Sequence, residues 1–268
     1  MLRTRILTAL VLLPLMLAAL FLFPASAWAV FAALVCGLAL WEFARMSGFT
    51  PWRNGIYLSV TALAAWGLGR AAVVPPPWLH GAVLAFWLLA VPLWLYRRWR
   101  APSGLTAALL GWLLLFPAWF AMLEWRPEAD AAHARQLLAI MGLVWIADVA
   151  AYFAGKAFGK RKLAPAISPG KSWEGVAGAL LAVALYVQWV NHMGWMLLPL
   201  SRWQWLALAL PLTMVSVGGD LLESWFKRCA GMKDSSALLP GHGGVYDRID
   251  SLIAVLAVSN ALRALAGW

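Results

Sequence analysis

The stretch of residues 218–250, GGDLLESWFKRCAGMKDSSALLPGHGGVYDRID, determines how the rest of this chain is interpreted. Nine of its 33 residues are charged, whereas only 12% of the whole chain is charged. Glycines, a proline and a histidine separate the charges, and apolar segments flank the stretch on both sides. Carboxylates and cations concentrated between hydrophobic segments indicate a functional site rather than a solvated surface.

The composition places this site in a membrane protein. The chain has 268 residues, 63% of them hydrophobic and 19 of them tryptophan, and its mean hydropathy is +0.77. No soluble core of this size needs so much apolar surface. A net charge of +10 would suggest nucleic acid in a soluble protein, but here the cations lie in short loops. We therefore expect anionic membrane lipid, and no nucleic acid, as their partner.

The apolar segments predict an all-α fold, a polytopic bundle of about nine transmembrane helices. The expected spans are 6–23, 26–44, 56–74, 78–96, 104–123, 136–155, 174–194, 203–222 and 250–267. Sixteen of the 21 Lys and Arg residues fall on the side that holds the N-terminus and the charged stretch. Because cytoplasmic loops carry the excess of cations, the N-terminus and the polar site are expected to be cytoplasmic.

The polar residues divide the chain into two regions. Residues 1–135 contain the first five spans, whose polar residues lie near the span ends, and we expect this region to be a scaffold. Residues 136–268 contain the last four spans and the cytoplasmic loops. This second region is expected to hold the catalytic residues.

The first polar residue of the second region that suggests chemistry is Asp148, inside an otherwise apolar span. A carboxylate at that depth is costly unless it is partnered or functional. Glycines and lysines follow in residues 155–175, and backbone amides and ammonium groups of this kind can converge on phosphate. The alternative is a positively charged cytoplasmic loop. Gly170-Lys171-Ser172 ends like a P-loop, but Pro165 replaces the required glycine and no strand is expected before it.

The charged stretch combines residues suited to metal with residues suited to phosphate. If the eighth span continues as a helix, Asp220, Ser224 and Lys227 share one face. Asp247 and Asp250 share another face at the start of the ninth span. Carboxylates without paired His or Cys favour Mg²⁺ over zinc. Surrounding cations would hold the phosphates.

A glycine pair lies beside these carboxylates in the sequence. Gly243-Gly244 permits a close approach of the backbone to an anion. His242 either contributes to that site or bonds the backbone of its own turn.

These residues resemble a known signature. The pattern is Ser224-x-Phe226-Lys227-Arg228-x4-Lys233-Asp234-x-Ser236-x2-Leu239-Pro240-x-His242-Gly243-Gly244-Val245-x-Asp247-Arg248-Ile249-Asp250. It is similar, without departure, to that of the phosphatidate cytidylyltransferases, also called CDP-diacylglycerol synthases. Upstream, Asp148, Tyr152, Gly155-Lys156, Phe158-Gly159-Lys160 and 167–175 also resemble the family, with Ser172 where threonine is expected. Residues 1–135 match only in being hydrophobic spans.

The resemblance implies an activity and a set of site residues. CTP and phosphatidate would yield CDP-diacylglycerol and pyrophosphate, with Mg²⁺, at the cytoplasmic face of a bacterial inner membrane. Asp220, Asp247 and Asp250 would surround the metal, and Ser224 would contact metal or phosphate. The expected cations for the triphosphate and the lipid phosphate are Lys227, Arg228, Lys233 and Arg248. Asp148, Lys171, Ser172, His242, Gly243 and Gly244 complete the expected substrate site. A second, monovalent cation and a homodimer are left open.

Three other functions share part of this pattern. A CTP-dependent polyprenol or phytol kinase would use the same nucleotide but transfer a phosphoryl group. A CDP-alcohol phosphotransferase shares Asp247-x-x-Asp250, but here Ser251 follows and the second aspartate pair is missing. An ion-coupled transporter would explain the intramembrane Asp148 and Asp220. Transporters of this kind usually contain two similar halves, and this sequence has no such repeat.

Overall fold

The computed structural model describes residues 2–71 and 73–268, and this part of the chain consists of helices with one short hairpin. The N-terminal helices are α1 (Leu2–Leu22), α2 (Ala25–Met46), α3 (Pro51–Arg70) and α6 (Gly104–Glu124). Between α3 and α6, the segments α4 (Pro77–Ala85), η1 (Phe86–Ala90) and α5 (Val91–Arg97) form one continuous rod. The C-terminal helices are α7 (Ala131–Phe158), α8 (Trp173–His192), α9 (Arg202–Cys229) and α10 (Tyr246–Ala266).

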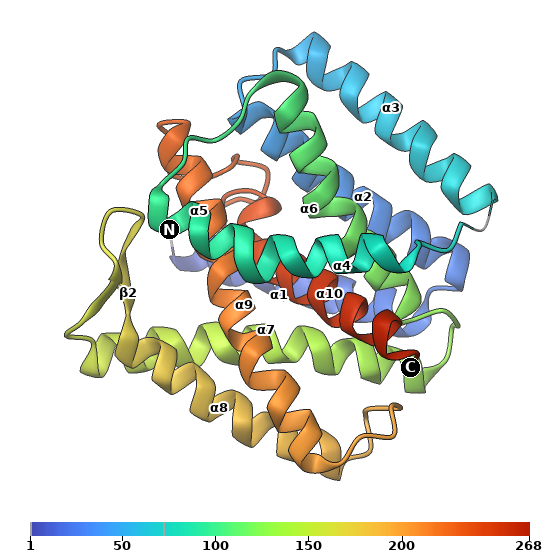
Figure 1. Ribbon diagram of the computed structural model, residues 1–268, viewed down its shortest axis with the longest axis vertical. Helices are drawn as coiled ribbons and strands as arrows, with labels where there is room; N and C mark the ends of the chain where they lie inside the picture. The colour runs from blue at the N-terminus through green and yellow to red at the C-terminus, as the bar shows by residue number, and fades with distance from the viewer. Residues whose placement is uncertain (1, 72) are drawn as a thin grey trace.

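Each of the nine expected spans is helical, which confirms the all-helical class. Seven of these helical segments are long and apolar enough to cross a membrane, and α1 and α3 are outside that set. In α3, the buried residues are Asn54 and Tyr57, so most of this helix faces away from the body of the protein. Figure 1 shows α3 set apart at one corner of the bundle. The number of crossings and the orientation stay predictions.

Helix α10 lies at the centre of the bundle. Every residue from Ser251 to Ala261 is buried, and α9, α6 and α4 all pack against this helix. Helices α7 and α8 pack along each other on one side, and α2 and α6 pack together on the other side (Figure 1). One hydrophobic core includes residues from both sides of the boundary at residue 135. The division into a scaffold and a catalytic region stays a prediction, but the two regions are not separately packed.

Short polar residues start several of these helices. The Ser201 hydroxyl accepts a hydrogen bond from the Gln204 amide, and the Gln204 side chain accepts one from the Ser201 amide, so α9 begins with a capping box. The Asp130 carboxylate accepts from the amides of Ala132 and His133 at the start of α7. These acceptors satisfy amides that have no partner within their own helix.

The hairpin between α7 and α8 differs from the sequence prediction. Strand β1 (Lys162–Ala164) pairs antiparallel with β2 (Ser168–Ser172), so the expectation of no strand here was wrong. Buried Ile167 lies in the turn, and the glycine and lysine of Gly170-Lys171-Ser172 lie within β2 itself. In a P-loop these residues would instead follow a strand. The hairpin is visible at the left of Figure 1, beside the first turn of α8.

Candidate functional site

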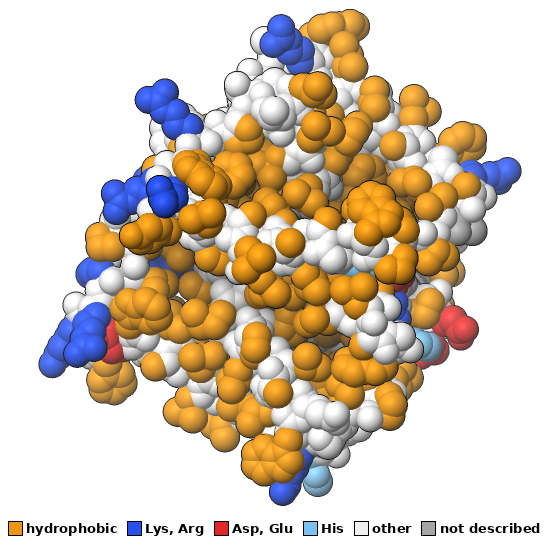
Figure 2. Space-filling view, in the orientation of Figure 1, with side chains coloured by type: hydrophobic (Ala, Val, Ile, Leu, Met, Phe, Trp, Pro, Cys, Tyr) orange, Lys and Arg blue, Asp and Glu red, His pale blue; other side chains and the backbone are white. Residues whose placement is uncertain are grey.

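The residues of the charged stretch gather at one end of the bundle. Here the last turns of α9 meet the first turn of α10, the loop 230–245 connects them, and β2 contacts α9 and α7. Figure 2 shows several Lys and Arg side chains along the left edge of the molecule, while hydrophobic side chains cover the middle of this face. This end is therefore rich in cations, and it borders an apolar middle face.

The close approach of α9 to α10 brings two of the predicted carboxylates together. A Cβ atom on Gly219 would lie 2.8 Å from the Asp250 carbonyl oxygen and 3.2 Å from Cα of Ser251. Only a residue without a side chain allows this contact. Asp220, the next residue, accepts a hydrogen bond of 3.3 Å from the Ser224 hydroxyl. Its other carboxylate oxygen lies 2.6 Å from Nζ of Lys171 on β2.

Asp148, Asp220 and Asp250 form what we call the three-carboxylate cluster. Asp148 on α7 interacts electrostatically with Asp220, Lys171 and Arg248. Asp250 interacts electrostatically with Asp220, Asp148 and Lys171. The cluster therefore combines side chains from α7, α9 and α10 with the hairpin lysine. Like charges repel each other, and a cation bound beside them would relieve this repulsion.

Asp247 lies one turn before Asp250 but is held by different partners. Its Oδ2 accepts hydrogen bonds from the amides of Ser235 at 2.9 Å and Gly244 at 2.7 Å. The Ser235 hydroxyl lies 3.0 Å from the same oxygen. Oδ1 of Asp247 lies 2.7 Å from Nζ of Lys227, which also contacts Glu223 at 2.8 Å. The Asp247 side chain is only 2% exposed.

Glu42 on α2 is a site residue that the sequence interpretation missed. It is fully buried, and its carboxylate accepts hydrogen bonds from the hydroxyls of Ser235 and Ser236. It also accepts from the amides of Val245 and Tyr246. A carboxylate within an apolar span was the signal that singled out Asp148, and the same signal was present at Glu42. Glu42 was overlooked because residues 1–135 were expected to be a scaffold without site residues.

Two further residues from the N-terminal helices contact the same loop. The guanidinium of Arg45 on α2 donates a hydrogen bond of 2.7 Å to the Ser235 carbonyl. The Thr8 hydroxyl on α1 donates one of 2.8 Å to the Pro240 carbonyl. The N-terminal region therefore holds the loop that carries the signature.

The glycine pair at 243–244 does approach anions closely, but those anions belong to the protein. A Cβ atom on Gly243 would lie 2.6 Å from Oδ2 of Asp247, and the Gly243 backbone has a φ of +85°. A Cβ atom on Gly244 would collide with the Ser235 hydroxyl and with both Glu42 oxygens. His242 lies in the same turn and donates its amide hydrogen to the Leu239 carbonyl. These residues shape the loop around Glu42 and Asp247.

Other predicted substrate residues occupy positions around the hairpin and the surface. The Ser172 hydroxyl caps α8 by accepting from the Gly175 amide, and it packs against Gly155 and Gly159. Nε of Arg228 donates to the Ile167 carbonyl in the hairpin turn. Among the predicted substrate residues, Asp148, Arg228, Lys233 and Arg248 are exposed. Gly155, Gly159 and Gly175 thus serve the contact between α7 and the start of α8, whereas Gly170 has open space around it.

The donor atoms can be compared with what Mg²⁺ requires. Within residues 2–71 and 73–268, the His, Cys, Asp and Glu side chains do not form a group of three or more already arranged to hold a metal ion. Mg²⁺ commonly binds through one or two carboxylates and takes its remaining ligands from water and substrate phosphate. The three-carboxylate cluster fits this pattern. Asp247 fits it less well, because protein donors already occupy its oxygens.

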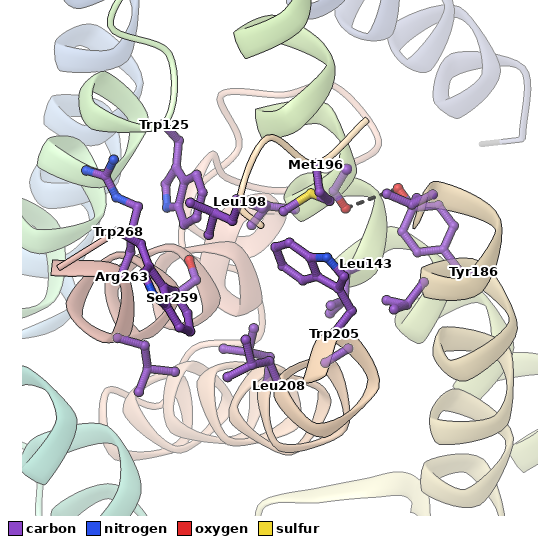
Figure 3. Close-up of a pocket in the computed structure, with 17 residues that line it drawn as sticks. Trp125, Leu143, Tyr186, Met196, Leu198, Trp205, Leu208, Ser259, Arg263 and Trp268 are labelled. Carbon is purple, nitrogen blue, oxygen red and sulfur yellow. Dashed lines mark hydrogen bonds between the residues drawn. The ribbon is translucent and has the colours of Figure 1, made fainter. Parts of the chain in front are cut away.

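Two apolar pockets lie elsewhere in the bundle, and the larger one is bordered by Leu238 of the loop 230–245. One, shown in Figure 3, is at the C-terminal end of α10 and is lined by Trp125, Tyr186, Trp205 and Arg263, among others. Its free volume of about 60 Å³ is far below the usual size of a ligand pocket. The other has about 640 Å³ and lies between α2, α3 and α6. Neither contains the carboxylates and lysines of the signature, so the polar end is the candidate active site.

Comparison with known proteins shows the family of this chain. A model of the cytidylyltransferase family matches residues 3–266. The chain belongs to this family. The phosphatidate cytidylyltransferase of Pseudomonas aeruginosa is 44% identical over an alignment that covers all of this chain and 99% of that protein. The protein of the same name from Haemophilus influenzae is 36% identical, with 96% of each chain covered. That from Brucella suis is 47% identical over 47% of this chain and 46% of that protein.

The cytidylyltransferase family match extends the resemblance seen in the sequence. That resemblance was carried by residues 148–250, whereas the family match also includes α1 to α6. Glu42, Arg45 and Thr8, which hold the signature loop, lie within the matched region. Both halves of the chain therefore belong to the family.

Proposed function

We propose that this protein is a phosphatidate cytidylyltransferase. It converts CTP and phosphatidate into CDP-diacylglycerol and pyrophosphate, a step of phospholipid synthesis. The observation that carries this proposal is the full-length identity of 44% to a protein of that name, together with the gathering of the signature residues at one polar end. The kinase and transporter alternatives have no comparable support.

The reaction requires positioning and charge neutralisation more than proton transfer. A phosphate oxygen of phosphatidate attacks the α-phosphorus of CTP, and the bond from that phosphorus to the β-phosphate oxygen breaks. Pyrophosphate leaves with the bonding electrons. A phosphate monoester already carries negative charge at neutral pH, because its second pKa is about 6. Little general-base help is needed, and the protein must hold two anions in line against their repulsion.

The cations and carboxylates have separate roles in this scheme. Asp220 and Asp250 would hold Mg²⁺, with Asp148 beside them, and a bound ion would neutralise charge on the triphosphate. Lys171 exchanges its contact with Asp220 for a substrate phosphate. The triphosphate and the lipid phosphate are further neutralised by Arg228, Lys233 and Arg248. Asp247 and Lys227 hold the loop and the first turn of α10 in place.

In this proposal, the polar end of the protein faces the cytoplasm. CTP is a soluble nucleotide and phosphatidate a membrane lipid, so the site must be reached from both phases. The excess of Lys and Arg on the side of the charged stretch supports a cytoplasmic orientation, in the inner membrane of a bacterial cell.

Pyrophosphate release by the detergent-purified protein tests the proposal. The protein is given phosphatidate and Mg²⁺, with CTP, ATP, GTP and UTP supplied in separate reactions. We expect release with CTP alone, and none when lipid or metal is omitted. Formation of CDP instead of pyrophosphate would identify a kinase. No product from folded protein with any nucleotide would refute the cytidylyltransferase and reopen the transporter alternative.

A further inference from the structure

The N-terminus of α10 has no capping side chain of its own. Its N-cap residue is Val245, whose side chain cannot accept a hydrogen bond. The first amides of a helix need acceptors, and the positive end of the helix dipole favours an anion there. Glu42 supplies both, because its oxygens lie 3.0 Å from the Val245 amide and 2.6 Å from the Tyr246 amide. This acceptor comes from α2, 204 positions away in the sequence.

Glu42 also holds the other end of the signature loop. Its two oxygens accept from the hydroxyls of Ser235 and Ser236. The Ser235 hydroxyl lies 3.0 Å from Glu42 and 3.0 Å from Asp247, so it bridges the two carboxylates. Both ends of the loop 235–246 are therefore hydrogen-bonded to the same buried side chain, that of Glu42.

We propose that Glu42 is a positioning residue for catalysis. It fixes the loop 235–246 and the first turn of α10, and through them the carboxylates of Asp247 and Asp250. It touches no substrate in this scheme and acts through the geometry of the residues that do. The proposal rests on the cytidylyltransferase function, but part of its test is independent of activity.

The hydrogen-bond inventory explains why a carboxylate is needed here rather than an amide. All four partners of Glu42 can donate, and a carboxylate accepts on both oxygens. In Glu42→Gln one oxygen becomes an NH₂ group. The serine hydroxyls can rotate and accept from it, but the facing backbone amide cannot. Each of the two amide orientations sets one backbone N–H, that of Val245 or of Tyr246, against another donor.

The loop hydrogen bonds can be measured directly by hydrogen exchange. Wild type and Glu42→Gln are compared in detergent, with peptides that cover 235–250 resolved by mass spectrometry. We expect exchange in this segment to rise at least tenfold in the variant, while peptides from α7 and α8 keep the wild-type rate. Gln136→Leu is the matched control, since Gln136 is another buried polar residue that accepts from a loop amide, that of Leu197, at the far end of the molecule.

Kinetics then separate positioning from stability. Per folded protein and well below the melting temperature, Glu42→Gln should lose at least tenfold in kcat, with KM for CTP within about twofold. Gln136→Leu should keep the wild-type kcat even where it melts earlier. Wild-type kcat in Glu42→Gln with loosened 235–250 exchange would show Glu42 to be a structural residue only. Unchanged exchange in that segment would overturn the proposal altogether. If the wild type itself released no pyrophosphate, the proposed function would fail, and the exchange result would still decide whether Glu42 holds the loop.

Discussion

Four of the aspartates at the polar end, Asp148, Asp220, Asp247 and Asp250, differ in what holds them. Asp220 pairs with Lys171 on the hairpin, and Asp250 accepts from the Ser251 amide. Asp148 is exposed on α7. Asp247 is instead enclosed by the loop amides and Lys227. At the scale of single residues, the first three are available to an incoming cation, whereas Asp247 is part of the frame.

Asparagine substitutions should separate these two roles. In Asp250→Asn the amide oxygen can still accept from the Ser251 amide, so folding is preserved. We expect activity to fall by about 10²–10³ and the Mg²⁺ concentration for half-maximal rate to rise, because a charged ligand is lost. In Asp247→Asn, Lys227 keeps its contact with Glu223, but the new NH₂ group faces either Lys227 or the amides of Ser235 and Gly244. All of these are donors, and a buried donor set against another donor costs about 1–3 kcal/mol. This variant should melt several degrees lower.

Thermal melts and Mg²⁺ titrations of the two purified variants check this distinction. Asp247→Asn should keep a Mg²⁺ requirement close to wild type in whatever activity remains. A raised Mg²⁺ requirement with an unchanged melting temperature in Asp247→Asn would place that residue on the metal instead.

The sequence located these residues better than it assigned their roles. The sequence alone shows that a carboxylate lies within an apolar span or that several carboxylates lie near a helix end. The partner of a carboxylate is not visible when it lies far away in the chain. Glu42 contacts residues 193 to 204 positions later. Only the packing of α2 against α10 brings them together.

At the scale of elements, two neighbouring glycines on α9 have different surroundings. A Cβ atom on Gly219 would meet the backbone of α10, whereas one on Gly218 would lie 3.9 Å from the Val91 side chain, an ordinary contact. Alanine is a better helix former than glycine by about 1 kcal/mol. Gly218→Ala and Gly219→Ala should therefore gain the same helix propensity. They differ because only the alanine at 219 would collide with the backbone of α10.

Gly219→Ala should therefore push α9 away from α10, separate Asp220 from Asp250, and reduce activity at least tenfold. Gly218→Ala should match the wild type in activity and be equally or more stable. Pyrophosphate release and thermal melts of both variants make the comparison. Equal activity in the two variants would mean that the approach of the helices at Gly219 does not set the site geometry.

The elements themselves were predicted with uneven success, for physical reasons. Long apolar runs predict helices directly, and all nine expected spans are helical. Strands β1 and β2 were missed because 162–172 is short and contains two lysines, two prolines and a glycine, a composition typical of loops. Their pairing depends on anchors outside the hairpin, such as the contacts of β2 with α7 and α9.

At the scale of the whole molecule, the two ends of the bundle are built differently. One end carries the charged residues of the candidate site. At the other end, Arg126 is 1% exposed, and its guanidinium donates to the carbonyls of Leu20 and Phe23 at the C-terminal end of α1. It also lies over the Trp28 ring. Burial lowers the pKa of Arg126, but an arginine remains charged at neutral pH. A cation at this helix end is stabilising.

This arrangement predicts that stability and catalysis can be changed separately. Arg126→Ala removes a buried cation together with its two hydrogen bonds, and it should lower the free energy of unfolding by about 2–4 kcal/mol. Arg135→Ala, at an exposed arginine on α7, is the matched control and should melt like the wild type. Arg126 lies at the opposite end of the bundle from the three-carboxylate cluster. At a temperature below both melting points, folded Arg126→Ala should therefore have the same kcat and the same Mg²⁺ requirement as the wild type. A fall in kcat without a fall in melting temperature would show instead that the two ends are coupled, and that the packing of α1 and α2 transmits changes at Arg126 to Glu42 and the signature loop.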